Sequence, residues 1–190
     1  MGILIAIAAV VILALVYGFS LYNGLVRLRE SVKQAWSNIG VLLKQRHDEL
    51  PKLVETCRQY MTYEQDTLER VLRARAGVAQ AQGAGNVRDL AAAEGALRSG
   101  LGRLYAVAEQ YPSLKANESF TQLQARITGL EEQIADRREL YNESVNLYNT
   151  RQALFPDSFV AGFGEFHPAH LLEFTSEEQA DPPIKALFGT

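Results

Sequence analysis

The fold is decided by residues 1–42, which read MGILIAIAAVVILALVYGFSLYNGLVRLRESVKQAWSNIGVL. Residues 1–26 contain no Asp, Glu, Lys, Arg or His, and most of them are Ile, Leu, Val or Ala. About 20 apolar residues in a helix match the roughly 30 Å hydrocarbon core of a bilayer. The sequence therefore predicts that residues 3–22 span a membrane as a helix.

The apolar run is predicted to stay on the protein rather than to be cleaved as a secretion signal. A signal peptide has a basic region before a shorter apolar stretch and a small-residue cleavage site after it. No Lys or Arg precedes this run, and residues 18–23 offer no convincing cleavage site. We expect residues 1–22 to form a permanent transmembrane anchor.

The basic residues beside the anchor predict its orientation. Arg27, Arg29 and Lys33 follow the span closely, and no basic residue precedes it. Basic flanks favour the cytoplasmic side of a membrane, so the N-terminus is expected outside and the C-terminal domain in the cytoplasm. The lone Cys57 is compatible with a reducing compartment.

The apolar spacing of residues 21–42 continues the anchor into the soluble domain. Apolar residues recur there at alternating intervals of four and three, which is the heptad pattern of a helix packed along one face. This first seam consists of Leu21, Leu25, Leu28, Val32, Ala35, Ile39 and Leu42. Because no helix breaker interrupts it, the span and the first soluble helix are expected to be one helix.

Three more apolar stripes of helical period follow, over about residues 54–78, 90–111 and 120–148. Asn86 and Asn117 are placed to cap the last two helices, and Pro156 ends the last one. The first boundary is ambiguous, because residues 47–51 fit either a turn or one long helix kinked at Pro51.

These stripes predict an all-α fold: an N-terminal transmembrane helix continuous with an antiparallel four-helix bundle, followed by an irregular C-terminal tail. A three-helix arrangement with a kinked first helix is the less favoured alternative. The expected organisation is an anchor at 1–22, a bundle at 23–156 and an aromatic-rich irregular tail at 157–190, which docks through its aromatic side chains.

Several sequence motifs resemble the signature of the LemA family. They are YNGLV at 22–26, AWSNI at 35–39, LKQRHDELPKLVET at 43–56, LRAR at 72–75, LKANESF at 114–120, IADRRELYN at 134–142, VNLYN at 145–149 and FP at 155–156. The resemblance covers about residues 1–165 in the family's order. It implies a bacterial membrane protein with an N-terminal span and a helical bundle, placed here in the inner membrane, and it implies no established biochemical activity.

Polar residues on the apolar stripes are the first group of candidate functional residues. A buried unpaired charge is costly, so such groups are expected to pair with one another or with nearby Tyr and Asn side chains. The candidate network consists of Glu64, Arg75, Arg137, Tyr141, Asn142, Tyr148 and Asn149. We favour an internal network that fixes the helix register; the alternative is a recognition groove for a partner helix.

The sequence offers no pattern typical of catalysis or of a cofactor. Glu131 and Glu132 are expected on a solvent-exposed face, Cys57 as a small buried residue, and His47 near a helix end. His167 and His170 flank Pro168 without a neighbouring carboxylate or Cys cluster, so no metal site is expected. We predict a protein that is not an enzyme and that takes no cofactor.

The leading functional hypothesis is a self-associating membrane scaffold. Small residues in the span permit close helix packing in lipid, and the first seam could extend the contact outside the bilayer. The candidate assembly contacts are Ala6, Ala9, Ala14, Gly18, Leu21, Leu25, Leu28 and Trp36.

The expected partners are membrane lipid, further copies of the chain and a second membrane protein. The 19 basic and 22 acidic side chains argue against nucleic acid. The alternative function is an adaptor or regulator of a membrane enzyme, such as a protease, that acts through the bundle.

Overall fold

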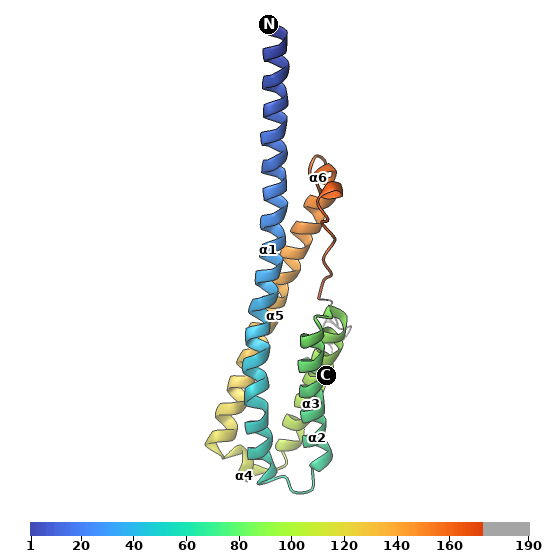
Figure 1. Cartoon of the computed structure of the whole chain (residues 1–190). Coiled ribbons are helices and arrows are strands. Elements are labelled where there is room, and N and C mark those ends of the chain that lie inside the picture. The colour runs from blue at the N-terminus through green and yellow to red at the C-terminus, as the bar shows by residue number, and fades with distance from the viewer. Residues whose placement is uncertain (173–190) are drawn as a thin grey trace, which may run out of the picture. The chain divides into compact units, whose positions relative to one another are not determined.

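A computed structural model describes residues 1–172, and every regular element within them is a helix. Figure 1 labels these helices. The chain divides into two units, which are described separately. The N-terminal unit comprises residues 1–39 and 137–171, and the bundle unit comprises residues 40–136 with Leu172.

Helix α1 runs without interruption from Gly2 to Arg58 and contains Pro51. The predicted continuity of the span with the first soluble helix is therefore confirmed. Of the two alternatives for residues 47–51, the turn is wrong, because the chain leaves α1 only after Arg58 and begins α2 at Gln65. At that break the Cys57 carbonyl accepts hydrogen bonds from the N–H groups of Tyr60 and Met61, at 3.0 and 2.9 Å.

Pro51 fits inside α1 because a side chain replaces the hydrogen bond that it removes. In a helix the carbonyl of His47 would accept the N–H of residue 51, which proline lacks. The Arg75 Nε donates to that carbonyl at 2.9 Å instead. A residue of α2 thus supplies the donor that keeps α1 helical across Pro51.

The bundle unit packs the later part of α1 with α2 (Gln65–Ala84), α3 (Val87–Ala108), the short α4 (Pro112–Lys115) and the first part of α5 (Glu118–Ala153). The expected caps are confirmed. The Asn86 Oδ1 accepts from the N–H groups of Arg88 and Asp89, and the Asn117 Oδ1 accepts from Phe120 N–H at 3.0 Å. Fully buried core side chains include Leu50, Leu53, Leu68, Leu90, Leu97, Leu104, Leu114 and Ile127.

The N-terminal unit pairs the first part of α1 with the second part of α5, which runs antiparallel to it (Figure 1). Its buried side chains include Leu25, Val32, Ile39, Val145 and Tyr148. The chain then forms α6 (Asp157–Phe163), turns at residues 164–165 and continues from Phe166 without regular secondary structure. The tail expected to be wholly irregular therefore begins with a helix, and residues 173–190 lie outside the described residues.

Candidate functional site

The first turns of α1 form a bare apolar surface. Among the described residues, α1 is the one helix long and apolar enough to cross a membrane, and none of its most apolar stretch is buried. Such a surface is costly in water but is the surface that lipid covers. The structure therefore supports a single N-terminal membrane anchor.

The segment after α5 is fastened to α5 by specific polar contacts. The Arg151 guanidinium binds the Asp157 carboxylate at 2.9 Å, and this carboxylate is almost fully buried. The Asn149 side chain both donates to the Ala169 carbonyl and accepts its N–H, each at 2.9 Å. The Tyr141 hydroxyl donates to the His170 carbonyl, also at 2.9 Å. These contacts fix the positions of α6 and of residues 164–170 on α5.

Phe166 ties the same segment to α1. Its ring packs edge-on against Tyr22, with 5.5 Å between the ring centroids, and the Arg29 guanidinium lies 5.3 Å from its centroid. A Cβ atom on Gly164 would lie 2.5 Å from the Phe166 ring and 3.3 Å from Tyr22. A side chain at position 164 would therefore force the Phe166 ring to shift.

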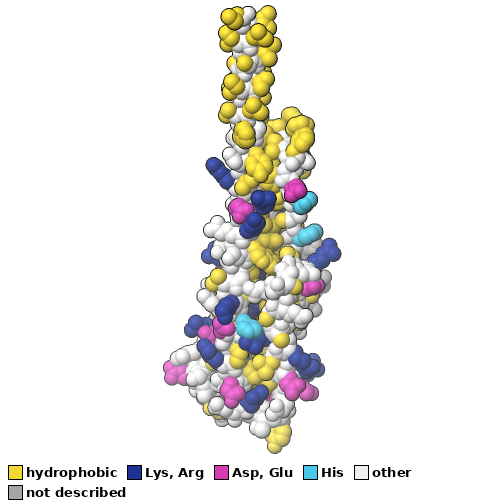
Figure 2. Space-filling view, viewed as in Figure 1, with side chains coloured by type: hydrophobic (Ala, Val, Ile, Leu, Met, Phe, Trp, Pro, Cys, Tyr) yellow, Lys and Arg dark blue, Asp and Glu magenta, His cyan; other side chains and the backbone are white. Residues whose placement is uncertain are grey.

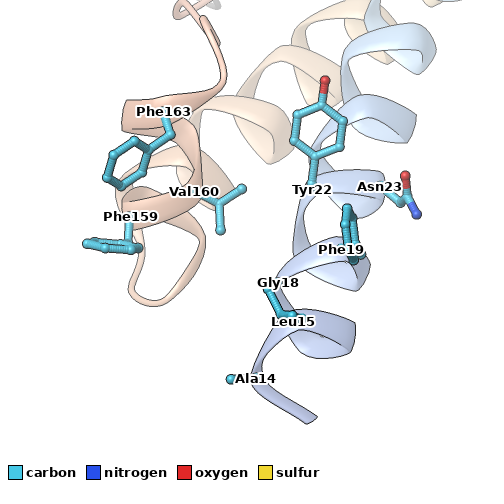
Figure 3. Close-up of a pocket in the computed structure, with 9 residues that line it drawn as sticks. All are labelled: Ala14, Leu15, Gly18, Phe19, Tyr22, Asn23, Phe159, Val160 and Phe163. Carbon is cyan, nitrogen blue, oxygen red and sulfur yellow. The ribbon is translucent and has the colours of Figure 1, made fainter. Parts of the chain in front are cut away.

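A groove of about 490 Å³ lies between α1 and α6 (Figure 3). The two helices contribute facing apolar side chains, and the small residues Ala14 and Gly18 leave the space open. Its lining residues are Ala14, Leu15, Gly18, Phe19, Tyr22, Asn23, Phe159, Val160 and Phe163. Its size is typical of a site for a small molecule or a lipid chain.

The structure separates the predicted assembly contacts into three groups. Ala6 and Ala9 are exposed on the free part of α1. Ala14 and Gly18 instead line the groove, and Leu21 and Leu28 are half-buried. Two residues are used inside the chain: Leu25 has no exposed surface, and Trp36 packs against Tyr141 with ring centroids 5.5 Å apart. Leu25 is therefore wrong as an assembly contact.

The predicted polar network is divided between the two units. Arg75 and the half-buried Glu64 belong to the bundle unit, and Glu64 lies in the turn before α2 rather than on a helix stripe. Arg137 is exposed, and the neighbouring Arg138 is buried in its place. The heptad assignment misplaced this residue because a straight helix drifts from an exact seven-residue repeat.

The Tyr and Asn members of that set lie on the α5 part of the N-terminal unit. Tyr141 and Asn149 bind backbone groups of residues 169 and 170, as described above. Tyr148 is buried, and Asn142 is half-buried. Tyr141 and Asn149 therefore help to hold the segment that follows α6, a role that the sequence did not reveal.

A buried charge cluster in the bundle unit was missed by the sequence analysis. Arg46 on α1 forms an ion pair with Glu94 on α3, and both side chains are at most 5% exposed. Glu131 on α5 lies 3.9 Å from the same guanidinium and is 20% exposed, so its expected place on a solvent face is wrong. The sequence did contain a signal for this burial. If the alternating spacing of four and three residues in the first seam is continued past Leu42, the next position is Arg46.

Burial controls the electrostatics of this cluster. Removal from water raises the pKa of Glu131, and the nearby Arg46 only partly opposes that rise. The Tyr105 hydroxyl is buried without a hydrogen-bond partner among the described residues, and burial also raises its pKa.

Cys57 is buried as predicted, and burial raises the pKa of its thiol to about 12. This cysteine is a poor nucleophile in the folded protein.

A second, smaller groove of about 320 Å³ lies between α1 and α2 of the bundle unit, and it is more polar than the first. Lys44, His47 and Gln82 contribute its polar side chains. Within residues 1–172, no three His, Cys, Asp or Glu side chains come together in a way that could hold a metal ion.

The fold and the bare apolar helix define a membrane-associated all-helical protein. The LemA family model matches residues 35–186, and the chain belongs to the LemA family. It is 25% identical to magnetosome proteins MamQ 1 and MamQ 2 of Paramagnetospirillum magneticum, and 24% identical to magnetosome protein MamQ of Magnetospirillum gryphiswaldense. Each comparison covers 86% of this chain and 68% of the relative.

Proposed function

We propose that this protein is a non-enzymatic, single-pass scaffold of the bacterial inner membrane that self-associates through its anchor. The observation that carries the proposal is the apolar N-terminal stretch of α1, which is fully exposed in the single chain. Lipid or other copies of α1 would cover it in the cell. The proposed orientation, with the N-terminus outside, rests on the basic residues that follow the span.

The face of α1 around Ala6 supports contact between copies. A recess of about 320 Å³ opens there between Ile3, Ala6, Ile7, Val10 and Val11. Helices in lipid associate through close packing at small residues, because lipid tails are as apolar as the side chains and provide no hydrophobic drive. A side chain from a neighbouring α1 would fill this recess.

Mass photometry of the full chain, purified in detergent, tests self-association. We expect homomeric particles much larger than a single chain. The double variant Ala6→Leu with Ala9→Leu fills the small-residue face and should shift the particles towards monomers. Ile12→Leu, which changes an exposed residue outside the recess, is the matched control and should leave the particles unchanged. Monomers of the unaltered chain over the whole concentration range would refute the proposal.

The polar groove of the bundle unit supports a second candidate function, that of an adaptor for a membrane enzyme. Lys44, His47 and Gln82 offer hydrogen-bonding and charged groups beside the apolar Leu43 and Val78. An adaptor should run as a monomer or dimer and co-purify with one partner at fixed stoichiometry. The substitutions Lys44→Ala and Gln82→Ala should remove that partner and leave any homomeric particles intact.

A further inference from the structure

The segment around α6 exposes an unusual number of large aromatic side chains. Phe155, Phe159 and Phe163 are 86, 67 and 79% exposed, and Leu154 is 54% exposed. Phe159 and Phe163 stack edge to face, with 5.0 Å between ring centroids. Figure 2 shows hydrophobic side chains over the free part of α1 and again beside it. A patch of this kind marks a surface that another molecule covers.

The position of α6 along α1 indicates which molecule that is. The groove residues of α1 run from Ala14 to Asn23, the last turns of the apolar stretch. At 1.5 Å per residue they extend over about 14 Å, close to half of the roughly 30 Å hydrocarbon core. If α1 spans the membrane, α6 lies at the depth of one leaflet.

The groove, like a phospholipid, has one apolar end and one more polar end. Ala14, Leu15 and Gly18 line one end with apolar surface, and Tyr22 and Asn23 bring polar groups to the other end. Arg27 and Arg29 follow within two turns of α1, at the depth of the headgroups. Basic side chains at that level attract anionic phospholipid headgroups.

The groove is preformed in the single chain. The Arg151–Asp157 ion pair holds the start of α6, and Asn149 holds the chain beyond it at Ala169. Phe166, in contact with both Tyr22 and Arg29, holds the segment beside α1. A preformed site loses less ordering entropy on binding than one that must be assembled.

We propose that the groove between α1 and α6 binds one acyl chain of a phospholipid in the leaflet where α1 leaves the membrane, and that Phe159 and Phe163 insert into the same leaflet. This inference rests on the proposed membrane anchor. It adds a second membrane contact and a lipid site that neither the anchor nor self-association requires.

Native mass spectrometry of the full chain tests the lipid site. The unaltered protein should retain one phospholipid per chain after exchange into detergent. Gly18→Leu places a large side chain in the groove, because Gly18 lines it, and the change causes no clash, because a Cβ at this position meets no atom within 4 Å. The lipid-bound fraction should fall by about tenfold or more, because the added side chain occupies the ligand's space. Ala8→Leu, a similar small-to-large change outside the groove, should keep its lipid. Equal lipid retention by both variants would refute the site.

Depth-dependent fluorescence quenching tests the insertion of α6 separately from the anchor. Single-tryptophan variants, made with Trp36→Phe, carry either Phe163→Trp or Leu13→Trp and are placed in nanodiscs containing brominated phospholipid. Both tryptophans should be quenched. Quenching of Leu13→Trp alone would overturn the α6 proposal and leave the anchor standing, whereas quenching of neither would overturn both. Protection of Phe163→Trp together with crosslinks between copies would assign the patch to a second chain instead of lipid.

Discussion

Burial in the bundle unit alters the ionisation of Glu131. Burial raises its pKa above the ordinary value of 4.5, so the folded protein favours the protonated carboxyl. The stabilisation that this proton provides is complete below the ordinary pKa and is lost as the pH rises through the folded-state value. At neutral pH the ionised Glu131 carboxylate therefore destabilises the folded protein.

The substitution Glu131→Gln should accordingly leave the protein at least as stable as the unaltered chain at pH 7.5. Its advantage should shrink as the pH falls towards 4.5, where Glu131 becomes protonated even in the unfolded chain. Thermal unfolding followed by circular dichroism across this range measures the difference. A variant that is less stable at pH 7.5 than at acidic pH, relative to the unaltered protein, would contradict the assignment.

Unlike Glu131, Glu94 is expected to stabilise the folded protein. Without the Glu94 carboxylate, the buried Arg46 guanidinium keeps the more distant Glu131 as its carboxylate neighbour. Glu94→Gln should cost about 3–5 kcal/mol of unfolding free energy, as expected when one partner of a buried ion pair is lost. Lys44→Ala, which breaks an exposed pair with Asp48, should cost at most about 1 kcal/mol. Chemical unfolding of the two variants compares these losses.

Arg75 and Pro51 form a pair that a double-mutant cycle can isolate. Arg75→Leu leaves the His47 carbonyl without a donor and should cost about 1–3 kcal/mol. In a Pro51→Ala background the new N–H at position 51 can bind that carbonyl, so the same Arg75→Leu change should cost less. Equal costs in both backgrounds would show that Arg75 acts through some other contact.

At the scale of elements, the segment that follows α5 depends on a few contacts with α5 and α1. Asn149→Ala removes both hydrogen bonds to Ala169. We expect faster amide hydrogen exchange at residues 157–171, with exchange in the buried parts of α1 and α5 unchanged. Asn146→Ala, which changes an exposed residue one turn away, serves as the control. Unchanged exchange in the Asn149 variant would show that other contacts hold the segment.

The helices were predictable where the apolar period was long and uninterrupted. The seams predicted α3, α5 and the continuation of the span into α1. The second seam, residues 54–78, was wrong as a single helix, because it crosses from the end of α1 into α2. The end of α1 was misplaced for a physical reason: the donor that rescues Pro51 comes from Arg75, on another helix. The true break, residues 59–64, contains neither Gly nor Pro and so carries no local signal.

At the scale of the whole molecule, the all-α class and the family were predictable, but the groove was not. Its two walls come from residues 14–23 and 159–163, which only the folding of α6 beside α1 brings together. The buried Arg46–Glu94 pair also joins residues that are far apart in sequence. Local periodicity places a residue on a face of a helix, but it does not say which distant residue that face meets.

The orientation in the membrane can be tested with the chain's own cysteine left in place. Cys57 is buried with a pKa of about 12 and should not react with a maleimide in the folded protein. Tyr63→Cys places a thiol at a position that is 94% exposed. In intact cells this thiol should be labelled only by a membrane-permeant maleimide. Labelling by an impermeant reagent would place the bundle unit outside.

The bond between Arg75 and the His47 carbonyl also sets an order of events during synthesis. The chain leaves the ribosome in sequence order, so the membrane span and Pro51 emerge before Arg75 does. For that interval the chain around Pro51 lacks the donor that its folded form uses. Insertion of the span can therefore precede completion of α1, and the growing chain retains a natural hinge at Pro51 until α2 emerges and docks.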